Sequence, residues 1–321
     1  MRAIVVRAFG GPEVMQLSDV PEPSSPGPGE VLVRIEATGV NFSDTERRRG
    51  TYSPPPLPWI PGREAAGEVM AAGPGVDPAL VGSRVAFFSR RASGTYAELS
   101  TVPASALFRF HTELPFDVMA ALPLQGMTAH GVLQFAAMRP GQTALVLAAA
   151  GGVGLILVQL ARRAGVRVIG VVSAPEKRLA VASLGAEVIT GYEGFDQTAL
   201  SLTNGRGVDV VFDSVGRAAE VASFASLAPH GQLIYYGDAS GLPSPVGVDS
   251  LYGRSLRVGA FGLDADRDVE SADIARRELA GALARGELQL SVSRSYSLGE
   301  AAAAHRALEG RMTTGKLVLV P

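Results

Sequence analysis

The stretch ALVLAAAGGVGLILVQLARRAG, residues 144–165, decides how this chain folds. An apolar run over 144–149 stops at a glycine-rich turn, and a helical pattern begins at Gly152. That order predicts a buried β-strand, a tight turn and a helix. The turn, residues 149–154, reads Ala-Ala-Gly-Gly-Val-Gly. This is the dinucleotide-binding fingerprint with alanine in the first glycine position.

The glycines of this turn have separate physical purposes. Gly151 lets the backbone approach a pyrophosphate, and Gly154 lets the helix pack closely on its strand. The free N–H groups and the dipole of the new helix then face the anion. We therefore expect the backbone of Ala150, Gly151, Gly152, Val153 and Gly154 to bind a dinucleotide. The alternative is a strand–helix turn that binds nothing.

Length and composition limit the remaining possibilities. A chain of 321 residues suggests about two domains. Apolar residues make up 47% and charged residues 19%, which is typical of a globular protein. The net charge of −2 gives no reason to expect a nucleic-acid or membrane partner. No apolar run reaches the ~18 residues of a membrane span. We expect a cytoplasmic protein.

The pattern of the chain predicts an α/β fold with two domains. Residues 1–122 are rich in proline, glycine and alternating apolar residues, and residues 262–321 are expected to return to this β-rich domain. Residues 123–261 alternate strand and helix, which predicts a doubly wound parallel sheet, the Rossmann fold. The expected strands of that sheet are 144–149, 167–172, 187–190, 208–213, 231–236 and 256–260.

Ligands bind where the strand order of such a sheet reverses, beside the ends of its first and fourth strands. Ser214 follows the fourth expected strand, and Gly237 follows the fifth. We expect both residues to lie near the dinucleotide.

The end of the second expected strand predicts the kind of dinucleotide. NAD-binding chains normally place Asp or Glu there to bind the ribose 2′-hydroxyl. Here Ser173 stands at that position, and Lys177 and Arg178 follow. A hydroxyl and two cations suit a 2′-phosphate, so we expect NADPH. Glu176 is the contrary signal, and we place it facing solvent. The alternative is that Lys177 and Arg178 form an exposed helical face.

Metal chemistry has little support in the sequence. The chain has no cysteine and four histidines, His111, His130, His230 and His305, without the spacing of metal ligands. No metal is expected.

Several motifs together resemble one family. They are the AAAGGVG turn, the SxxxK segment, VFDSVG, the terminal TTGKLVLVP, and the segments 39–44, 50–52, 62–67 and 94–98. The whole chain resembles the zinc-independent quinone oxidoreductase family of the medium-chain dehydrogenase/reductase superfamily. The resemblance implies that the β-rich domain is a GroES-like catalytic domain. It also aligns Asn41, Arg63 and Gln125 with the zinc ligands of the alcohol dehydrogenases, and these three make no convincing zinc site.

The resemblance also implies catalytic residues. Tyr52, in the motif Gly-Thr-Tyr, is the expected proton donor or carbonyl polariser, because a phenol can donate to a developing enolate. The alternative is an aromatic side chain that packs on the neighbouring proline loop. Asn41 is expected near the nicotinamide, where it would bind the cofactor or the substrate carbonyl. Asp44 is expected to hold the start of a helix.

Further cofactor contacts are implied by matching. The resemblance assigns Thr128 to the phosphates or nicotinamide, Tyr192 to the neighbourhood of the 2′-phosphate and Arg311 to the cofactor. For the arginine run 47–49 we expect a solvated helix face that could meet an anionic substrate.

These observations predict an NADPH-dependent, zinc-free reductase of quinones or α,β-unsaturated carbonyls. Three alternatives remain: an enoyl-thioester reductase whose carrier meets the arginine run, a nonenzymatic NADPH-binding regulatory or structural protein, and an alcohol dehydrogenase, which the missing ligand set disfavours. Residues 256–261 should form the bare edge of the Rossmann sheet. The resemblance implies a homodimer paired at this edge.

Overall fold

The computed structural model describes residues 1–90, 92, 94–110, 112–241, 247, 249–263 and 269–321. The chain folds into two compact units, unit 1 with residues 1–127 and 264–321, and unit 2 with residues 128–263. We propose that these units correspond to the two domains expected from the sequence, whose expected boundaries lie at 122/123 and 261/262. None of the described helices has both the length and the apolar character needed to cross a membrane. His111 lies outside the described residues.

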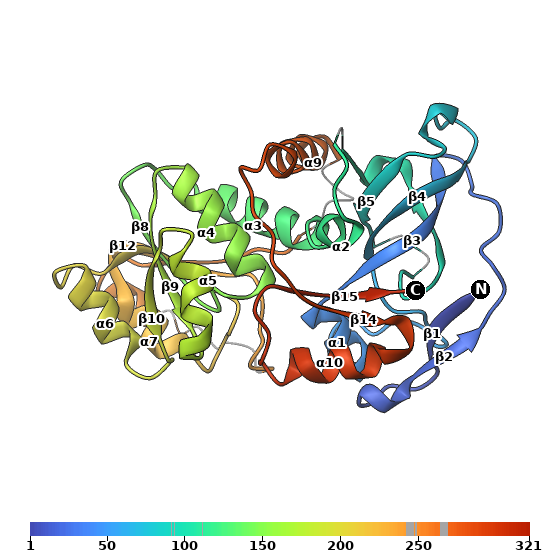
Figure 1. Cartoon of the computed structure of the whole chain (residues 1–321). Helices are drawn as coiled ribbons and strands as arrows, with labels where there is room; N and C mark the ends of the chain where they lie inside the picture. The colour runs from blue at the N-terminus through green and yellow to red at the C-terminus, as the bar shows by residue number, and fades with distance from the viewer. Residues whose placement is uncertain (91, 93, 111, 242–246, 248, 264–268) are drawn as a thin grey trace. The chain divides into compact units, whose positions relative to one another are not determined.

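Unit 2 contains a parallel sheet of six strands in the order β10-β9-β8-β11-β12-β13 (Figure 1). The first strand, β8, and the fourth, β11, are neighbours, so the strand order reverses between them as expected. β13 forms one edge of the sheet, which confirms the expected edge strand. The strands are β8 (Thr143–Val146), β9 (Arg167–Val172), β10 (Glu187–Thr190), β11 (Val208–Asp213), β12 (Leu227–Tyr235) and β13 (Arg257–Ala260).

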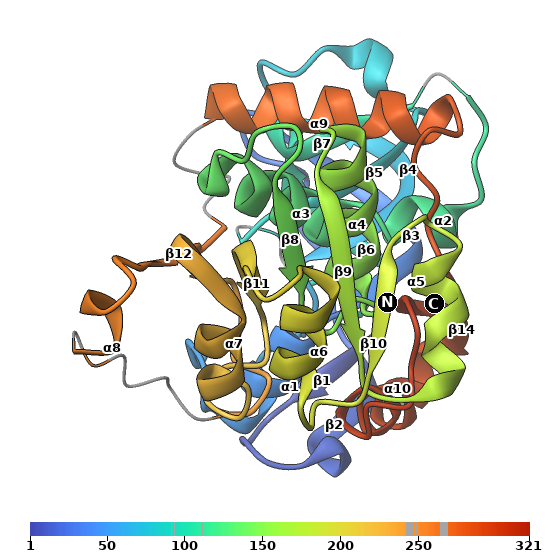
Figure 2. The ribbon, with the colours of Figure 1, turned by 90° about the vertical axis from the view of Figure 1, so that its left-hand side faces the viewer.

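Helices cover both faces of this sheet, with α3 and α4 on one face and α6 and α7 on the other (Figures 1 and 2). Buried side chains of the strands, such as Leu145, Ile169 and Val211, pack with Phe195 and Phe224 of the helices. Burial of this apolar surface stabilises the doubly wound arrangement. The helices are α3 (Pro123–Ala136), α4 (Gly152–Arg163), α5 (Arg178–Ala182), α6 (Phe195–Leu202), α7 (Glu220–Ser226) and α8 (Asp249–Tyr252).

Several boundaries differ from the sequence expectation, and the largest shift is the start of β12, at Leu227 rather than at residue 231. β8 ends at Val146 rather than at residue 149, because Ala148 takes a left-handed φ of 48° and turns the chain before the helix. Pro175 starts a 3-10 turn after β9, and α5 therefore begins only at Arg178.

Unit 1 contains a sheet with the strand order β14-β15-β3-β4-β5-β7, in which β6 also pairs with β3. The last strand of the chain thus pairs with β3 of the N-terminal region, which explains why residues 264–321 belong to unit 1. The helices are α1 (Phe42–Arg49), α2 (Phe116–Ala120), α9 (Val269–Ala284) and α10 (Ala301–Glu309). The strands are β1 (Arg2–Val6), β2 (Met15–Asp19), β3 (Glu30–Val40), β4 (Glu64–Ala72), β5 (Arg84–Phe88), β6 (Leu99–Pro103), β7 (Leu107–Arg109), β14 (Val292–Ser297) and β15 (Lys316–Val320).

The register of three neighbouring strands brings distant residues to one end of the unit 1 sheet. β15 pairs antiparallel with β3, with Leu317 opposite Val40. β3 pairs antiparallel with β4, with Thr38 opposite Ala65. The residues next to these pairs are therefore neighbours in space, although they come from opposite ends of the chain.

Candidate active site

The glycine turn of unit 2 has the geometry that nucleotide binding requires. Gly151 is the N-cap of α4, so the amides of residues 152–154 form its first turn and have no intrahelical carbonyl partner. A Cβ on Gly154 would lie 2.5 Å from the carbonyl oxygen of Ala148 and 2.7 Å from Cα of Ala149. This close approach supports the packing purpose assigned to Gly154. Ala150 is buried in the turn.

Tyr192 holds the backbone just before this turn through a hydrogen bond. The amide of Ala148 donates to the Tyr192 hydroxyl at 3.0 Å, and the ring of Tyr192 packs edge-on against Phe195 at a centroid distance of 6.2 Å. Ala148 is the residue with the left-handed φ, so this bond holds the backbone in a conformation that a non-glycine residue rarely takes. Tyr192 therefore shapes the nucleotide loop, and its expected place near the 2′-phosphate stays a prediction.

The loops after β11 and β12 are held together beside the turn. Asp213 is fully buried, and its carboxylate accepts from the amides of Val215 and Gly216 at 2.7 and 2.9 Å. Burial raises the pKa of Asp213, while these two bonds oppose the rise. The amide of Ala239 donates to the carbonyl of Ser214 at 2.9 Å.

Gly237 belongs to the same pair of loops. A Cβ on it would lie 3.3 Å from Cβ of Ser214. The two expected residues are thus adjacent at the carboxyl edge of the sheet.

The residues predicted to select the 2′-phosphate lie directly after β9. Ser173 is exposed, Glu176 is exposed as expected, and Lys177 is 8% exposed. The interpretation of Lys177 as part of an exposed face is therefore wrong. Arg178 is exposed and donates to the carbonyl of Val188 at 2.7 Å.

In unit 1, a buried ion pair lies where the three strands meet. Glu64 begins β4, Lys316 begins β15, and Asn41 follows the end of β3. The ammonium of Lys316 donates to Glu64 Oε1 at 2.5 Å and to Asn41 Oδ1 at 2.7 Å. The side chains of Lys316 and Glu64 are 4% and 0% exposed. Burial lowers the pKa of Lys316, and the charge of Glu64 opposes this.

Lys316 determines which atoms donate and which accept in the hydrogen bonds of this cluster. An ammonium can only donate, so the Asn41 atom that faces Lys316 must be the oxygen. The amide nitrogen of Asn41 then faces Glu64 Oε1 at 2.8 Å, and Gln125 Nε2 donates to Asn41 Oδ1 at 2.5 Å. Gln125 Oε1 is buried and has no hydrogen-bond partner in the described part of the chain.

Asp44 is the remaining buried acid of the cluster. The amide of Asn41 donates to Asp44 Oδ2 at 3.1 Å, which closes a capping box at the start of α1. This confirms the expected structural role of Asp44. Burial raises its pKa, and the positive charges of Arg63 and Lys316 oppose the rise.

The three positions aligned with zinc ligands have different surroundings. Asn41 and Gln125 are bonded to each other beside the Lys316 ammonium, and Arg63 donates to Ser43 Oγ at 3.3 Å. Among the described residues no group of three His, Asp or Glu side chains is arranged to hold a metal ion. The buried ammonium of Lys316 therefore lies beside two of these three positions, Asn41 and Gln125.

The expectation of a solvated face is wrong for Arg48 of the arginine run, whereas Arg49 is exposed. Arg48 is 0% exposed because α1 packs against α10. It donates to Glu309 at 2.6 Å and to Nδ1 of His305 at 3.1 Å. Arg49 pairs with Glu309 at 3.0 Å, and Arg47 stacks over Trp59 at 5.2 Å.

His305 continues this buried network toward the cluster. Since Arg48 can only donate, Nδ1 of His305 accepts, and its Nε2–H donates to the Tyr96 hydroxyl at 3.0 Å. Burial, together with the nearby Arg48 and Arg49, lowers the pKa of His305 to about 3. Burial raises the pKa of Tyr96 well above its ordinary value, and the charge of Asp44 adds to the rise.

Three further expected residues lie in different local settings. Tyr52 follows α1 in a loop and is 46% exposed. Thr128 is buried on α3, one turn after Gln125. Arg311 is exposed after α10, with a left-handed φ of 56°.

Sequence reasoning missed Glu64 and Lys316 as functional residues. Lys316 and Lys177 are the only lysines of the chain. Lys316 is buried beside Asn41, and Lys177 is buried within the expected cofactor segment. That rarity was the available signal. Glu64 gave none, because its partner lies 252 residues away in the sequence.

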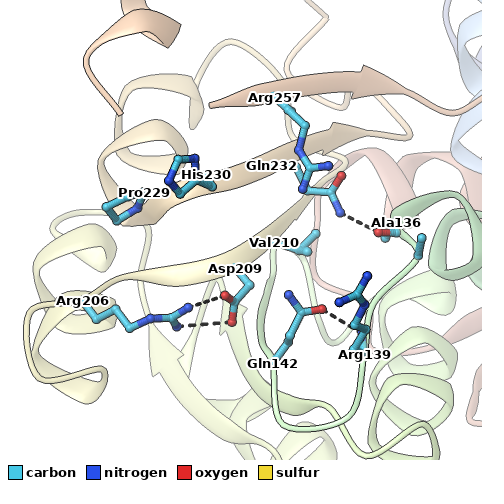
Figure 3. A pocket seen from close by; sticks show the side chains of 11 residues that line it. Ala136, Arg139, Gln142, Arg206, Asp209, Val210, Pro229, His230, Gln232 and Arg257 are labelled. Carbon is cyan, nitrogen blue, oxygen red and sulfur yellow. Dashed lines mark hydrogen bonds and ion pairs between the residues drawn. The ribbon is translucent and has the colours of Figure 1, made fainter. Parts of the chain in front are cut away.

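A cavity of about 510 Å³ lies at the opposite end of the unit 2 strands (Figure 3). Within it Arg206 pairs with Asp209 at 2.5 Å, and Gln232 Nε2 donates to the carbonyl of Ala136 at 2.6 Å. Nucleotides bind at the carboxyl edge of such sheets, so this cavity is not the expected nucleotide site. Its lining is Ala136, Ala137, Arg139, Gln142, Arg206, Asp209, Val210, Pro229, His230, Gln232 and Arg257.

Known families match both units. Residues 27–112 match the alcohol dehydrogenase GroES-like domain, and residues 152–274 match the zinc-binding dehydrogenase family. A quinone oxidoreductase of Pseudomonas aeruginosa is 39% identical, with 100% of this chain and 99% of the relative covered. The chain belongs to the quinone oxidoreductase family of the medium-chain dehydrogenase/reductase superfamily.

Two other members of this group bear on the chemistry. A 2-haloacrylate reductase of a Burkholderia species is 38% identical, with 99% of this chain and 98% of the relative covered. The structure of Escherichia coli quinone oxidoreductase complexed with NADPH matches with a TM-score of 0.93 and 34% identity, with 100% of both chains covered. The Rossmann and GroES-like domains predicted from the sequence are confirmed by these matches.

Proposed function

We propose that this protein is an NADPH-dependent reductase that transfers hydride to quinones or α,β-unsaturated carbonyls without zinc. The observation that carries the proposal is the buried ammonium of Lys316, bonded to Asn41 beside positions that hold zinc in the alcohol dehydrogenases. A divalent cation placed there would meet a fixed positive charge within the same hydrogen-bond network. The chain therefore favours a reaction that needs orientation and hydrogen bonding rather than a Lewis acid.

The glycine turn supports the choice of a nicotinamide nucleotide. Its helix has twelve residues, and its first-turn amides suit a pyrophosphate. Ser173 and Lys177 follow β9, where a 2′-phosphate would require a hydroxyl and a cation. The structure of the related Escherichia coli quinone oxidoreductase is that of its complex with NADPH. We propose the same cofactor here, with Gly151–Gly154, Ser173, Lys177, Ser214 and Gly237 as its principal contacts.

NADPH supplies the hydride when it is bound. The chain supplies the other requirements of the reaction. Asn41 is held rigidly by Lys316 and Glu64, so its amide needs no reorganisation when charge develops on a carbonyl. Tyr52 is 46% exposed, and its hydroxyl donates a hydrogen bond or a proton to the reduced acceptor. The 2-haloacrylate reductase relative adds support for an activated alkene as one acceptor class.

A panel of acceptors tests this function. Chelator-treated protein is mixed with NADPH and, in separate reactions, with quinones, enones, alkenals and enoyl thioesters, and oxidation of the nicotinamide is followed by absorbance. Acceptor-dependent oxidation with quinones or enones is the expected result. Turnover confined to enoyl thioesters would replace the proposal with that narrower activity, although Arg48 is buried and only Arg49 of the arginine run is exposed to a carrier. Tight NADPH binding without turnover on any acceptor would indicate a nonenzymatic protein.

We also propose a homodimer that pairs at β13, the edge strand of the unit 2 sheet. Light scattering at micromolar concentration is expected to give twice the mass of the chain. A monomer would contradict the pairing.

A further inference from the structure

The buried cluster of unit 1 holds two acceptor atoms without a hydrogen-bond partner among the described residues, Asp44 Oδ1 and Gln125 Oε1. The orientation of the second is set by its neighbours. The Lys316 ammonium can only donate, so the Asn41 atom that faces it is the acceptor Oδ1. Because Oδ1 can only accept, the Gln125 atom that faces Oδ1 is the donor Nε2. The amide of Gln125 therefore cannot be reversed without placing two oxygens 2.5 Å apart. Its Oε1 points away from the cluster, buried and without a partner among the described residues.

An unpaired buried acceptor is costly to a folded protein, and native structures contain few of them. Gln125 as a residue is 6% exposed, so bulk water does not relieve that cost. An acceptor held in this orientation by its neighbours is suited to a donor from a bound ligand. The required ligand group is an O–H or an N–H.

We propose that Gln125 Oε1 accepts a hydrogen bond from an O–H or N–H of the nicotinamide nucleotide, an inference that rests on the proposed function. Quinones and enones are excluded as the donor because they offer only carbonyl oxygens, which are acceptors. At its nicotinamide end the nucleotide offers two kinds of donor, the hydroxyls of the nicotinamide ribose and the N–H groups of the carboxamide. Thr128 is a predicted cofactor contact and follows Gln125 by three residues on α3, which places both on one helix face.

Nucleotide binding measured by titration without any acceptor tests this subsite. The variant Gln125→Met keeps the length of the side chain and removes the acceptor. It should bind NADPH about three- to tenfold less tightly than the unchanged protein, as expected for one neutral hydrogen bond. Gln232→Met is the matched control, because it also loses one glutamine hydrogen bond, to Ala136, at the other end of the unit 2 strands. Its NADPH affinity should be unchanged.

An analogue distinguishes the two donors and does not depend on the variant. The acetylpyridine analogue of NADPH replaces the carboxamide nitrogen with a methyl group. If the carboxamide is the donor, the unchanged protein should bind this analogue about five- to a hundredfold less tightly than NADPH, because Oε1 is again unpaired, and Gln125→Met should show little difference. If a ribose hydroxyl is the donor, Gln125→Met should weaken both ligands equally.

Binding of NADPH by Gln125→Met within twofold of the unchanged protein would overturn the inference and leave Oε1 satisfied by water alone. The proposed function would survive that result. If the unchanged protein failed to bind NADPH at all, the proposed function would fall and this subsite with it. If Gln125→Met does not fold, as judged by its melting transition, the unchanged protein supplies the test. If it binds both the acetylpyridine analogue and a ribose-deoxy NADPH as tightly as NADPH, the inference is overturned.

Discussion

Removal of one charge from the Lys316–Glu64 pair should destabilise unit 1 strongly. Lys316→Met leaves the carboxylate of Glu64, which is 0% exposed, without its cation. An uncompensated buried charge of this kind costs about 3–5 kcal/mol. Glu64→Gln should cost a similar amount, because it leaves the ammonium unpaired while it preserves the shape of the side chain.

The double variant Glu64→Gln/Lys316→Met carries no buried charge at this position. Replacement of a whole buried pair is often close to neutral. We expect its cost to be no larger than that of either single change, which gives a coupling of at least about 3 kcal/mol. Urea unfolding followed by fluorescence of Trp59, the single tryptophan of the chain, measures this in unit 1.

The exposed pair Arg167–Glu187 provides the control. Its side chains are 42% and 41% exposed, and Arg167 Nε lies 2.7 Å from Glu187 Oε1. The matched cycle with Arg167→Met and Glu187→Gln should give a coupling below about 1 kcal/mol. Additive effects of Lys316→Met and Glu64→Gln, within about 0.5 kcal/mol, would refute the idea that the two charges support each other.

Three other predictions concern single side chains. Lys177→Ala should weaken NADPH binding by about one to two orders of magnitude, from about 1.5–3 kcal/mol for a charged hydrogen bond, and change NADH binding little; equal losses for both nucleotides would reject the 2′-phosphate assignment. Tyr52→Phe should lower kcat about ten- to a thousandfold with an enone, and less with a quinone, at nearly unchanged NADPH affinity; an unchanged kcat with a rate-limiting chemical step would make it a packing residue. His305 has a pKa of about 3 in the folded protein, against an ordinary value of 6.5, so between these values only the unfolded chain binds the proton. The free energy of unfolding should therefore fall by about 1.4 kcal/mol for each pH unit as the pH drops from 6.5 toward 3. His305→Gln, which can keep both hydrogen bonds, should show a shallower loss in urea midpoints over that range, and an unchanged slope would contradict the buried neutral state.

The fold was predictable because its signals are local. The turn 149–154 was expected between a buried strand and a helix, and the structure has both, although the strand ends at Val146. Asp44 was also predictable, since a capping box involves residues only three apart.

The cluster around Asn41 depends on contacts that no local pattern contains. Its two charged partners come from other strands, and the Lys316–Asn41 bond spans 275 residues. Arg48 was misread for the same reason, because the helix that buries it lies 257 residues away at His305. Burial of a charge depends on which elements pack together, and periodicity along one helix does not report that.

The central claim is that this chain reduces an electrophilic acceptor with NADPH and without a metal. The most direct measurement is the anaerobic stoichiometry of the reaction catalysed by exhaustively chelated protein, with zinc content determined on the same sample. The account predicts many turnovers per chain, one NADPH oxidised for each quinone or enone reduced, and zinc far below one per chain. Loss of turnover on chelation, with recovery when one zinc per chain is restored, would contradict it.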